Sequence, residues 1–160
     1  LDLLGPAWKH WSVGGNLTVL DTEVEVPESE QESLAAFGLD EATRRLQGQP
    51  EFIFNVHVTY DNTRPGVSAG LFYNLVGETL LTGAARGVED GNPNVFETSF
   101  GILDFNIKKE FGPHVSLRLR ARNLLGDDKS SVYRIPNGDE AVKKLRETPT
   151  RIGVSLSYQW

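Results

Sequence analysis

Residues 152–160 read Ile-Gly-Val-Ser-Leu-Ser-Tyr-Gln-Trp, and this stretch decides the fold class. Apolar residues alternate in it with small or polar ones, without exception. In a β-strand successive side chains point to opposite sides, so one side of this segment is apolar and the other is polar. The apolar side consists of Ile152, Val154, Leu156, Tyr158 and Trp160. We therefore predict a strand with one face in an apolar environment and the other in water.

Five earlier segments alternate in the same way. They are residues 11–24, 51–61, 66–78, 98–111 and 114–123. Several reach or exceed the roughly 9–11 residues that a tilted membrane strand needs, whereas soluble strands are typically about 5–6 residues long. We therefore expect an all-β, antiparallel, up-and-down arrangement of about six strands.

The polar sides of these strands carry charge. Arg118, Arg120 and Arg122 stand in a row on one strand, and Asp104 and Glu110 lie on the preceding strand. Unpaired buried charges are very costly, so this face must meet water. The apolar face then packs either on a second protein layer or, in a wide barrel, on lipid. We expect the arginines to pair with the two carboxylates or with a plug inside a barrel; contact with an anionic substrate is the alternative.

Short and long connections alternate along the chain. Short turns rich in Gly and Pro occur at residues 5–6, 64–66 and 112–113, and long connections occur at residues 26–50, 80–97 and 124–149. Long structureless loops are uncommon in compact soluble domains. Short periplasmic turns opposite long extracellular loops are typical of outer-membrane barrels. The pattern thus predicts that Ser33, Glu89 and Asn137 face outside, and that Pro65 and Pro113 face the periplasm.

Some local structure is expected inside the long connections. The Ser29-Glu30-Gln31-Glu32 sequence fits a capping box and predicts a helix that continues through Phe37. Asp40 is expected to begin a further turn through Leu46, and residues 141–146 are expected to form a short helix. We expect these segments to be solvated rather than folded over a barrel mouth.

Aromatic residues gather near both ends of the apolar side. Trp11, Tyr60, Phe111 and Trp160 lie near the short turns, and Phe52 and Tyr73 lie near the long connections. Two such belts on one face are typical of membrane–water interfaces. Lys109 interrupts the apolar pattern near the short turns, where its ammonium group can reach the interface.

Composition narrows the classes of function. The net charge of −6 argues against a nucleic-acid partner, and the chain has no Cys for a disulfide or a cysteine zinc site. The three His residues have no metal-ligand spacing, and no nucleophile elbow, phosphate loop or dinucleotide fingerprint occurs. We therefore expect no enzyme, no cofactor and no metal site. No apolar run approaches the roughly 18 residues of a membrane helix.

Three stretches resemble a known family. Residues 45–50 read Arg-Leu-Gln-Gly-Gln-Pro and enter a strand; residues 121–127 read Ala-Arg-Asn-Leu-Leu-Gly-Asp and leave one; and the aromatic-ended strand 152–160 closes the chain. In this order and spacing they resemble the C-terminal part of the β-barrel of TonB-dependent receptors. The resemblance covers residues 1–160 as the last strands of an incomplete barrel, with no plug domain in this chain. Strand 152–160 also resembles the C-terminal assembly signal of bacterial outer-membrane proteins.

The family forms barrels of about 22 strands that enclose an N-terminal plug. Its members take up iron chelates, vitamins or glycans with energy from the inner membrane. The resemblance therefore implies a location in the bacterial outer membrane, and outer-membrane lipid, further barrel strands from the same or other chains, a plug domain and TonB as partners. The implied role is energy-coupled uptake, or a structural part of a larger barrel assembly. A soluble antiparallel β domain that binds a ligand or a protein is the alternative.

Six such strands cannot complete a membrane barrel. In lipid every backbone polar group needs a partner, and an open sheet leaves two edges unpaired. A barrel closed from six strands would be narrower than the eight-stranded kind, whose interior is just wide enough for side chains to fill. We therefore expect strands 11–24 and 152–160 to pair with strands outside this set. Pairing of these two strands with each other would favour the soluble alternative.

Overall fold

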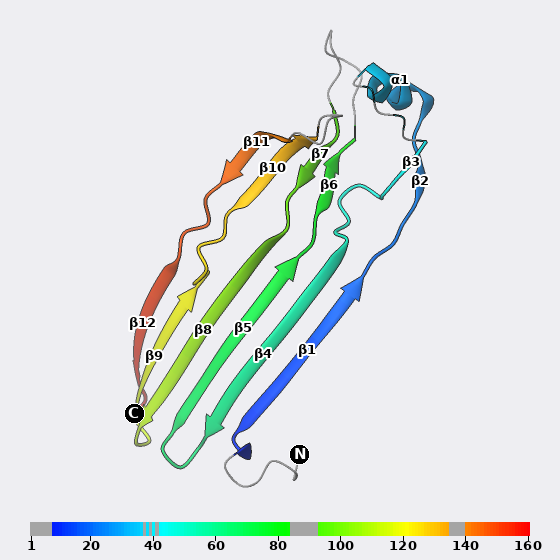
Figure 1. Ribbon diagram of the computed structural model, residues 1–160. Coiled ribbons are helices and arrows are strands. Elements are labelled where there is room, and N and C mark those ends of the chain that lie inside the picture. The colour runs from blue at the N-terminus through cyan, green and yellow to red at the C-terminus, as the bar shows by residue number, and fades with distance from the viewer. Residues whose placement is uncertain (1–7, 37, 39, 41, 84–92, 135–139) are drawn as a thin grey trace.

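The computed structural model describes residues 8–36, 38, 40, 42–83, 93–134 and 140–160. The fold is all-β, as the alternation predicts, with antiparallel sheets and one described helix. Figure 1 shows long strands side by side in a single curved layer, with shorter strands continuing beyond one end. Among the described residues, no helix is long and apolar enough to cross a bilayer.

The long strands form a six-stranded sheet in which every neighbouring pair is antiparallel. Its order is β1-β4-β5-β8-β9-β12. The strands are β1 (Trp11–Val19), β4 (Phe52–Asn62), β5 (Val67–Val76), β8 (Phe100–Phe111), β9 (Val115–Arg122) and β12 (Arg151–Tyr158). Each long strand pairs with the next long strand along the chain, so the up-and-down order is confirmed. The first strand ends at Val19, earlier than the alternation suggested.

Tight turns join the long strands at one end. In the β4–β5 turn the Gly66 amide donates to the Thr63 carbonyl over 3.1 Å, and Gly66 has a φ of 62°. Gly112, in the β8–β9 turn, has a φ of 70°. Residues with a side chain rarely adopt this left-handed backbone conformation. Glycine adopts it readily and so allows a tight turn between the two strands. Both turns lie at the end where β12 finishes (Figure 1).

Shorter elements occupy the opposite end. A four-stranded sheet has the order β11-β10-β7-β6, and β2 pairs with β3. The elements are β2 (Val24–Glu25), α1 (Glu28–Ala36), β3 (Thr43–Arg44), β6 (Thr79–Thr82), β7 (Val95–Glu97), β10 (Lys129–Arg134) and β11 (Glu140–Arg146). In Figure 1, β6, β7, β10 and β11 continue β5, β8, β9 and β12 in the same lateral order. The long connections therefore contain a second sheet.

Two local expectations in these connections are wrong. Residues 141–146 belong to strand β11, not to a helix, because their backbone pairs with β10 from Lys129 to Arg134. A six-residue helix is too short to be stable alone, so pairing with β10 prevails. Strand β3 replaces the turn expected from Asp40 to Leu46. The helix expected to begin after a cap at Ser29 is present, but it begins at Glu28 and so contains Ser29; Phe37, its expected end, lies outside the described residues.

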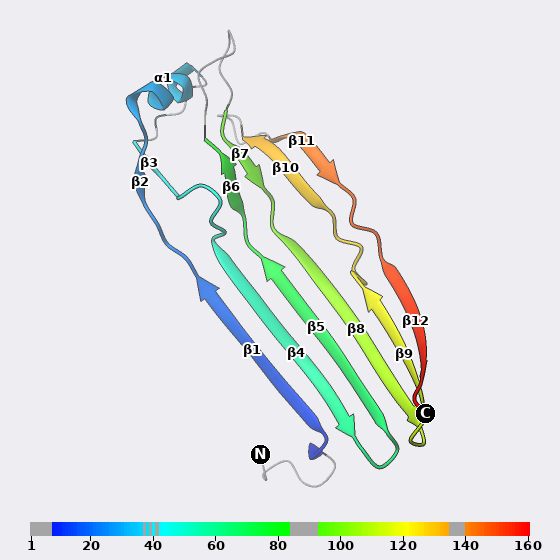
Figure 2. The ribbon, with the colours of Figure 1, turned by 180° about the vertical axis from the view of Figure 1, so that it is seen from behind.

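Among the described residues few apolar side chains are buried, and most of those lie toward the end opposite the tight turns. Val26 and Leu34, a residue of α1, form a small cluster, and Leu80, Val95 and Val132 are buried in the four-stranded sheet. Seen from both sides, no described element covers either face of the six-stranded sheet (Figures 1 and 2). The apolar residues of its long strands therefore have no second protein layer among the described residues.

The six-stranded sheet does not close into a barrel. Strands β1 and β12 are its two edges and do not pair with each other. The pairing that would favour the soluble alternative is therefore absent. Whether these edges pair with strands outside the set stays a prediction.

Candidate functional site

One face of the six-stranded sheet is almost wholly apolar. The registers keep the same parity from edge to edge, so that one row runs Trp11, Tyr60, Ala69, Ile107, Leu119, Val154. We call this side the apolar face. Its members are Trp11, Val13, Leu17, Val19, Phe52, Phe54, Val56, Val58, Tyr60, Val67, Ala69, Leu71, Tyr73, Leu75, Leu103, Phe105, Ile107, Phe111, Val115, Leu117, Leu119, Ala121, Ile152, Val154, Leu156 and Tyr158.

Many side chains of the apolar face are exposed. Val13 and Ile152 are both 72% exposed, and Leu156 is 73% exposed. Scattered exposed apolar residues are normal, but a contiguous apolar surface of this extent marks an interface with another molecule or with lipid. The candidate functional surface is therefore the whole face rather than a single pocket.

Lys109 is the single charged residue on the apolar face in these six strands. Its ammonium group donates to the carbonyl of Pro65 in the β4–β5 turn and lies 5.8 Å from the Phe111 ring centroid. The side chain thus reaches the tight-turn end of the sheet, as the sequence suggested. Its charge is carried away from the centre of the apolar face.

The predicted aromatic residues take three kinds of position. Trp11 and Tyr60 lie directly opposite each other near the tight turns, with ring centroids 5.0 Å apart. Phe111 ends β8 and Phe52 begins β4, so these two mark opposite ends of the sheet. Tyr73 lies within β5, where its ring meets that of Phe54 at 6.4 Å.

The terminal strand β12 presents Ile152, Val154, Leu156 and Tyr158 on the apolar face. Trp160 follows the strand and is fully exposed. Two hydrogen bonds hold this end against β9: the Gln159 amide donates to the His114 carbonyl, and the His114 Nδ1 lies 2.8 Å from the Gln159 carbonyl oxygen. The last strand thus continues the apolar surface to the edge of the sheet.

The other side, which we call the polar face, carries the charges. Arg118, Arg120 and Arg122 project from β9, and Arg151 on β12 lies directly opposite Arg122. Arg118 also lies opposite Lys108 of β8. All four arginines are exposed. The polar face therefore holds a cationic strip in a chain whose net charge is −6.

The expected pairing of these arginines with Asp104 and Glu110 is not formed. Glu110 binds Lys108, two residues back on its own strand, at 2.6 Å. The Asp104 carboxylate accepts the backbone N–H of Asn123 at 3.0 Å. Nearer donors thus occupy both carboxylates, and no ion pair of the strip arginines occurs in the described part of the chain.

The polar face also has an aromatic pair that the alternation did not single out. The His57 and Phe72 rings stack with centroids 5.9 Å apart and planes 25° apart. Gly14 and Gly70 leave room for them, because a Cβ at either position would come within 2.6 Å of a ring atom. The sequence indicates this pair only through Phe72, an aromatic residue at a position of β5 that belongs to the polar face.

The stretch that leaves β9 organises the junction of the two larger sheets. Asn123 is buried and has a left-handed backbone, with a φ of 51°. Its side-chain amide donates to the Asp127 carbonyl at 3.0 Å and to the Thr148 carbonyl. The Thr150 hydroxyl donates to the Asn123 carbonyl at 2.7 Å. One residue thus ties the end of β9 to the chain entering β12.

Asp127 and Asp128 complete this junction. Their carboxylates accept the backbone N–H groups of Gly101 and Thr148, each at 2.6 Å. These contacts give both acidic side chains a structural role, as acceptors for backbone N–H groups. Among the described residues, no group of three or more His, Cys, Asp or Glu side chains is placed to hold a metal ion.

An ion-pair cluster lies at the end of the molecule opposite the tight turns. Arg134 donates two hydrogen bonds to Glu78, at 3.1 and 2.5 Å, and one to Glu140 at 3.1 Å. The bonds to Glu78 are the main reason that the pKa of Arg134 is raised above its ordinary value. Arg134 therefore stays charged and links β10 to the junction of β5 and β6.

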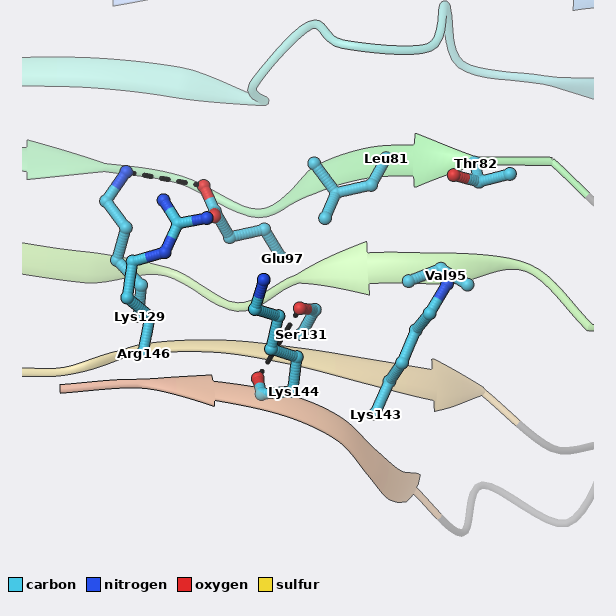
Figure 3. A pocket seen from close by; sticks show the side chains of 9 residues that line it. All are labelled: Leu81, Thr82, Val95, Glu97, Lys129, Ser131, Lys143, Lys144 and Arg146. Atoms are coloured by element: carbon cyan, nitrogen blue, oxygen red, sulfur yellow. Dashed lines mark hydrogen bonds and ion pairs between the residues drawn. The ribbon is translucent and has the colours of Figure 1, made fainter.

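A cavity of about 250 Å³ opens on the four-stranded sheet (Figure 3). Side chains of β6, β7, β10 and β11 line it, including Lys129, Lys143, Lys144 and Arg146. The alternation along the chain did not predict this site, because its strands were expected to be loops and a helix. The only sequence signal was the cluster of basic residues at positions 143–146.

No protein-family model, no curated protein and no solved structure matches this chain.

Proposed function

We propose that the six-stranded sheet is part of the wall of an outer-membrane β-barrel, with the apolar face against lipid and the polar face toward an aqueous lumen. The observation that carries this proposal is the apolar face, in which Lys109 is the single charge and which no described element covers. Burial of apolar area is worth roughly 25 cal/mol per Å², so a surface of this extent requires a cover.

Lipid fits as the cover for three reasons. The face has aromatic residues near the tight turns and mostly aliphatic residues between the ends, where Phe54, Tyr73 and Phe105 are the exceptions. Aromatic residues at the interface and aliphatic residues in the hydrocarbon core are the distribution that a bilayer selects. Lys109, its one charge within the six strands, is directed to the tight-turn end. The opposite face carries Arg118, Arg120 and Arg122, which a packed protein layer could not hold without partners.

We further propose that the chain supplies C-terminal barrel strands to a TonB-dependent receptor. The support is the resemblance of residues 45–50, 121–127 and 152–160 to that family. The role would be energy-coupled uptake of a substrate such as an iron chelate, a vitamin or a glycan, with a plug domain, TonB and further barrel strands as partners. The junction made by Asn123 and Asp127 gives the second of these stretches a structural purpose.

Site-directed fluorescence tests the lipid assignment. Trp8, Trp11 and Trp160 would be replaced by Phe, and one new Trp would be placed at Leu119 or at the neighbouring Arg120. In the complete protein in bilayers, lipids brominated along the acyl chain should quench Leu119→Trp but not Arg120→Trp. Iodide in the buffer should quench Arg120→Trp alone.

The two positions are adjacent in β9 and lie on opposite faces, so they are matched controls for each other. A protein that stays monodisperse without detergent, with neither Trp quenched by brominated lipid, would favour the soluble alternative. Energy-coupled uptake would be tested separately, by transport assays with and without TonB.

A further inference from the structure

The cavity on the four-stranded sheet concentrates positive charge. Four cationic side chains line it, and Glu97 is the one carboxylate among its lining residues. Glu97 lies 3.6 Å from Lys129. Four cations less one carboxylate leave three positive charges around a small space. Lys143, Lys144 and Arg146 form no ion pair within the described part of the chain.

A β-bulge brings two of these cations to the same cavity. Alternation would place the consecutive residues Lys143 and Lys144 on opposite sides of β11. The register shifts here: Lys144 lies opposite Ser131 and Val142 lies opposite Val132, which leaves Lys143 as the extra residue. Both lysines therefore line the cavity (Figure 3). Bulges re-aim side chains in this way and are frequent beside functional sites.

Like charges around the cavity repel one another. Arg146 lies directly opposite Lys129, and like charges at opposite positions of paired strands repel each other. Glu97 offsets only part of this repulsion. A bound anion would relieve the rest, so the arrangement of charges favours an anionic ligand.

We infer that this cavity is a binding site for a phosphate group. A phosphate ester carries roughly −1.5 to −2 charges at neutral pH and three acceptor oxygens, which fits three uncompensated cations better than one carboxylate does. Ser131 also lines the cavity; its hydroxyl donates to the Lys144 carbonyl over 3.4 Å and so holds β10 against the lysine pair. Leu81 and Val95 give the cavity an apolar side, which can take a small organic group attached to the phosphate.

The phosphate can come from two sources, a small soluble ester or a lipid headgroup, and the chemistry of recognition is the same for both. The inference rests on the four-stranded sheet and does not depend on the proposed membrane role. It adds a ligand site outside the two faces of the six-stranded sheet.

Calorimetric titration of the complete purified protein tests the inference, with inorganic phosphate, glycerol 3-phosphate and micellar phosphatidic acid as probes. Lys144→Gln/Arg146→Gln should weaken binding by about tenfold or more, since each charge-assisted contact is lost. The matched control Lys9→Gln/Arg64→Gln removes the same charge from exposed positions at the tight-turn end, remote from the cavity. It should change the affinity by less than about twofold.

The outcomes separate cleanly. Binding of the soluble probes supports the site with a soluble source, and binding of phosphatidic acid alone supports it with a lipid source. The inference is overturned if no probe binds, or if the control pair weakens binding as much as the cavity pair does. Circular dichroism and gel filtration of both variants exclude misfolding as the cause.

Discussion

Asn123 donates its side-chain amide to the backbone carbonyl of Asp127 over 3.0 Å, and this bond lies where the six-stranded sheet meets the four-stranded one. The same amide also binds the Thr148 carbonyl. One side chain therefore joins the outgoing end of β9 to the segment that enters β12. We expect the alignment of the two larger sheets to depend on it.

Replacement of Asn123 by Ala should destabilise the protein by about 1–3 kcal/mol, because two partly buried carbonyl groups lose their donor. Asn123→Gly keeps the left-handed backbone accessible but also loses the amide. It should therefore fall between Ala and the native residue. Urea unfolding followed by tryptophan fluorescence measures both variants. Equal stability of all three proteins would show that the junction does not depend on these bonds.

Arginine substitutions should discriminate between the two faces of β9. Leu117→Arg or Leu119→Arg puts a charge on the apolar face and should cost about 2–4 kcal/mol near the bilayer midplane. Ser116→Arg adds the same charge to the polar face and should be much milder. Folding yield into vesicles is the measurement. Equal tolerance at residues 116 and 117 would contradict the assignment of the faces.

Labelling in intact cells should report the orientation. Ser33 lies in α1, at the end of the sheet opposite the turns that contain Pro65 and Pro113 (Figure 1). The other predicted external positions, Glu89 and Asn137, lie outside the described residues. The chain has no native Cys, so single Cys variants give no background. An impermeant maleimide should label residue 33 and spare residues 65 and 113; the reverse pattern would invert the orientation.

Neutralisation of one arginine of the cationic strip on the polar face should stabilise the six-stranded sheet at low salt. Arg122 and Arg151 lie directly opposite each other, so Arg151→Gln should relieve about 0.2–1 kcal/mol of repulsion. The gain should disappear at about 1 M salt, where the Debye length is about 3 Å. Unfolding curves at both ionic strengths measure it. A loss of stability at low salt would instead show that Arg151 binds an anionic group in the complete protein.

The two sheet edges should be paired in the complete protein. Half of the backbone N–H groups of β1 and of β12 point away from their neighbours β4 and β9, toward the open edges. In hydrogen–deuterium exchange, the amides that point to the open edge should be protected as well as those that bond to β4 or β9, because lipid offers no substitute partner. Rapid exchange of every second amide in β12 would show that this edge stays open and would contradict the barrel proposal.

The sequence determined the six long strands and their two faces. A period of two is a local property, so Ile152 through Tyr158 show their parity without knowledge of any partner strand. The tight turns at Gly66 and Gly112 were also readable, because few residues other than glycine take the required backbone. The ion pairs of the polar face were not readable, since the Lys108–Glu110 contact competes in space with the expected arginine pairs.

Only the tertiary structure decided what the long connections do. Strand β11 forms because the backbone of residues 140–146 pairs with β10. The alternation within so short a segment is too weak to predict a strand from the sequence. The cationic cavity depends in turn on that pairing and on the bulge at Lys143. Faces follow from local alternation along one strand. Partners, bulges and convergent charges depend on which distant segments share hydrogen bonds, and that choice is made by the folded chain as a whole.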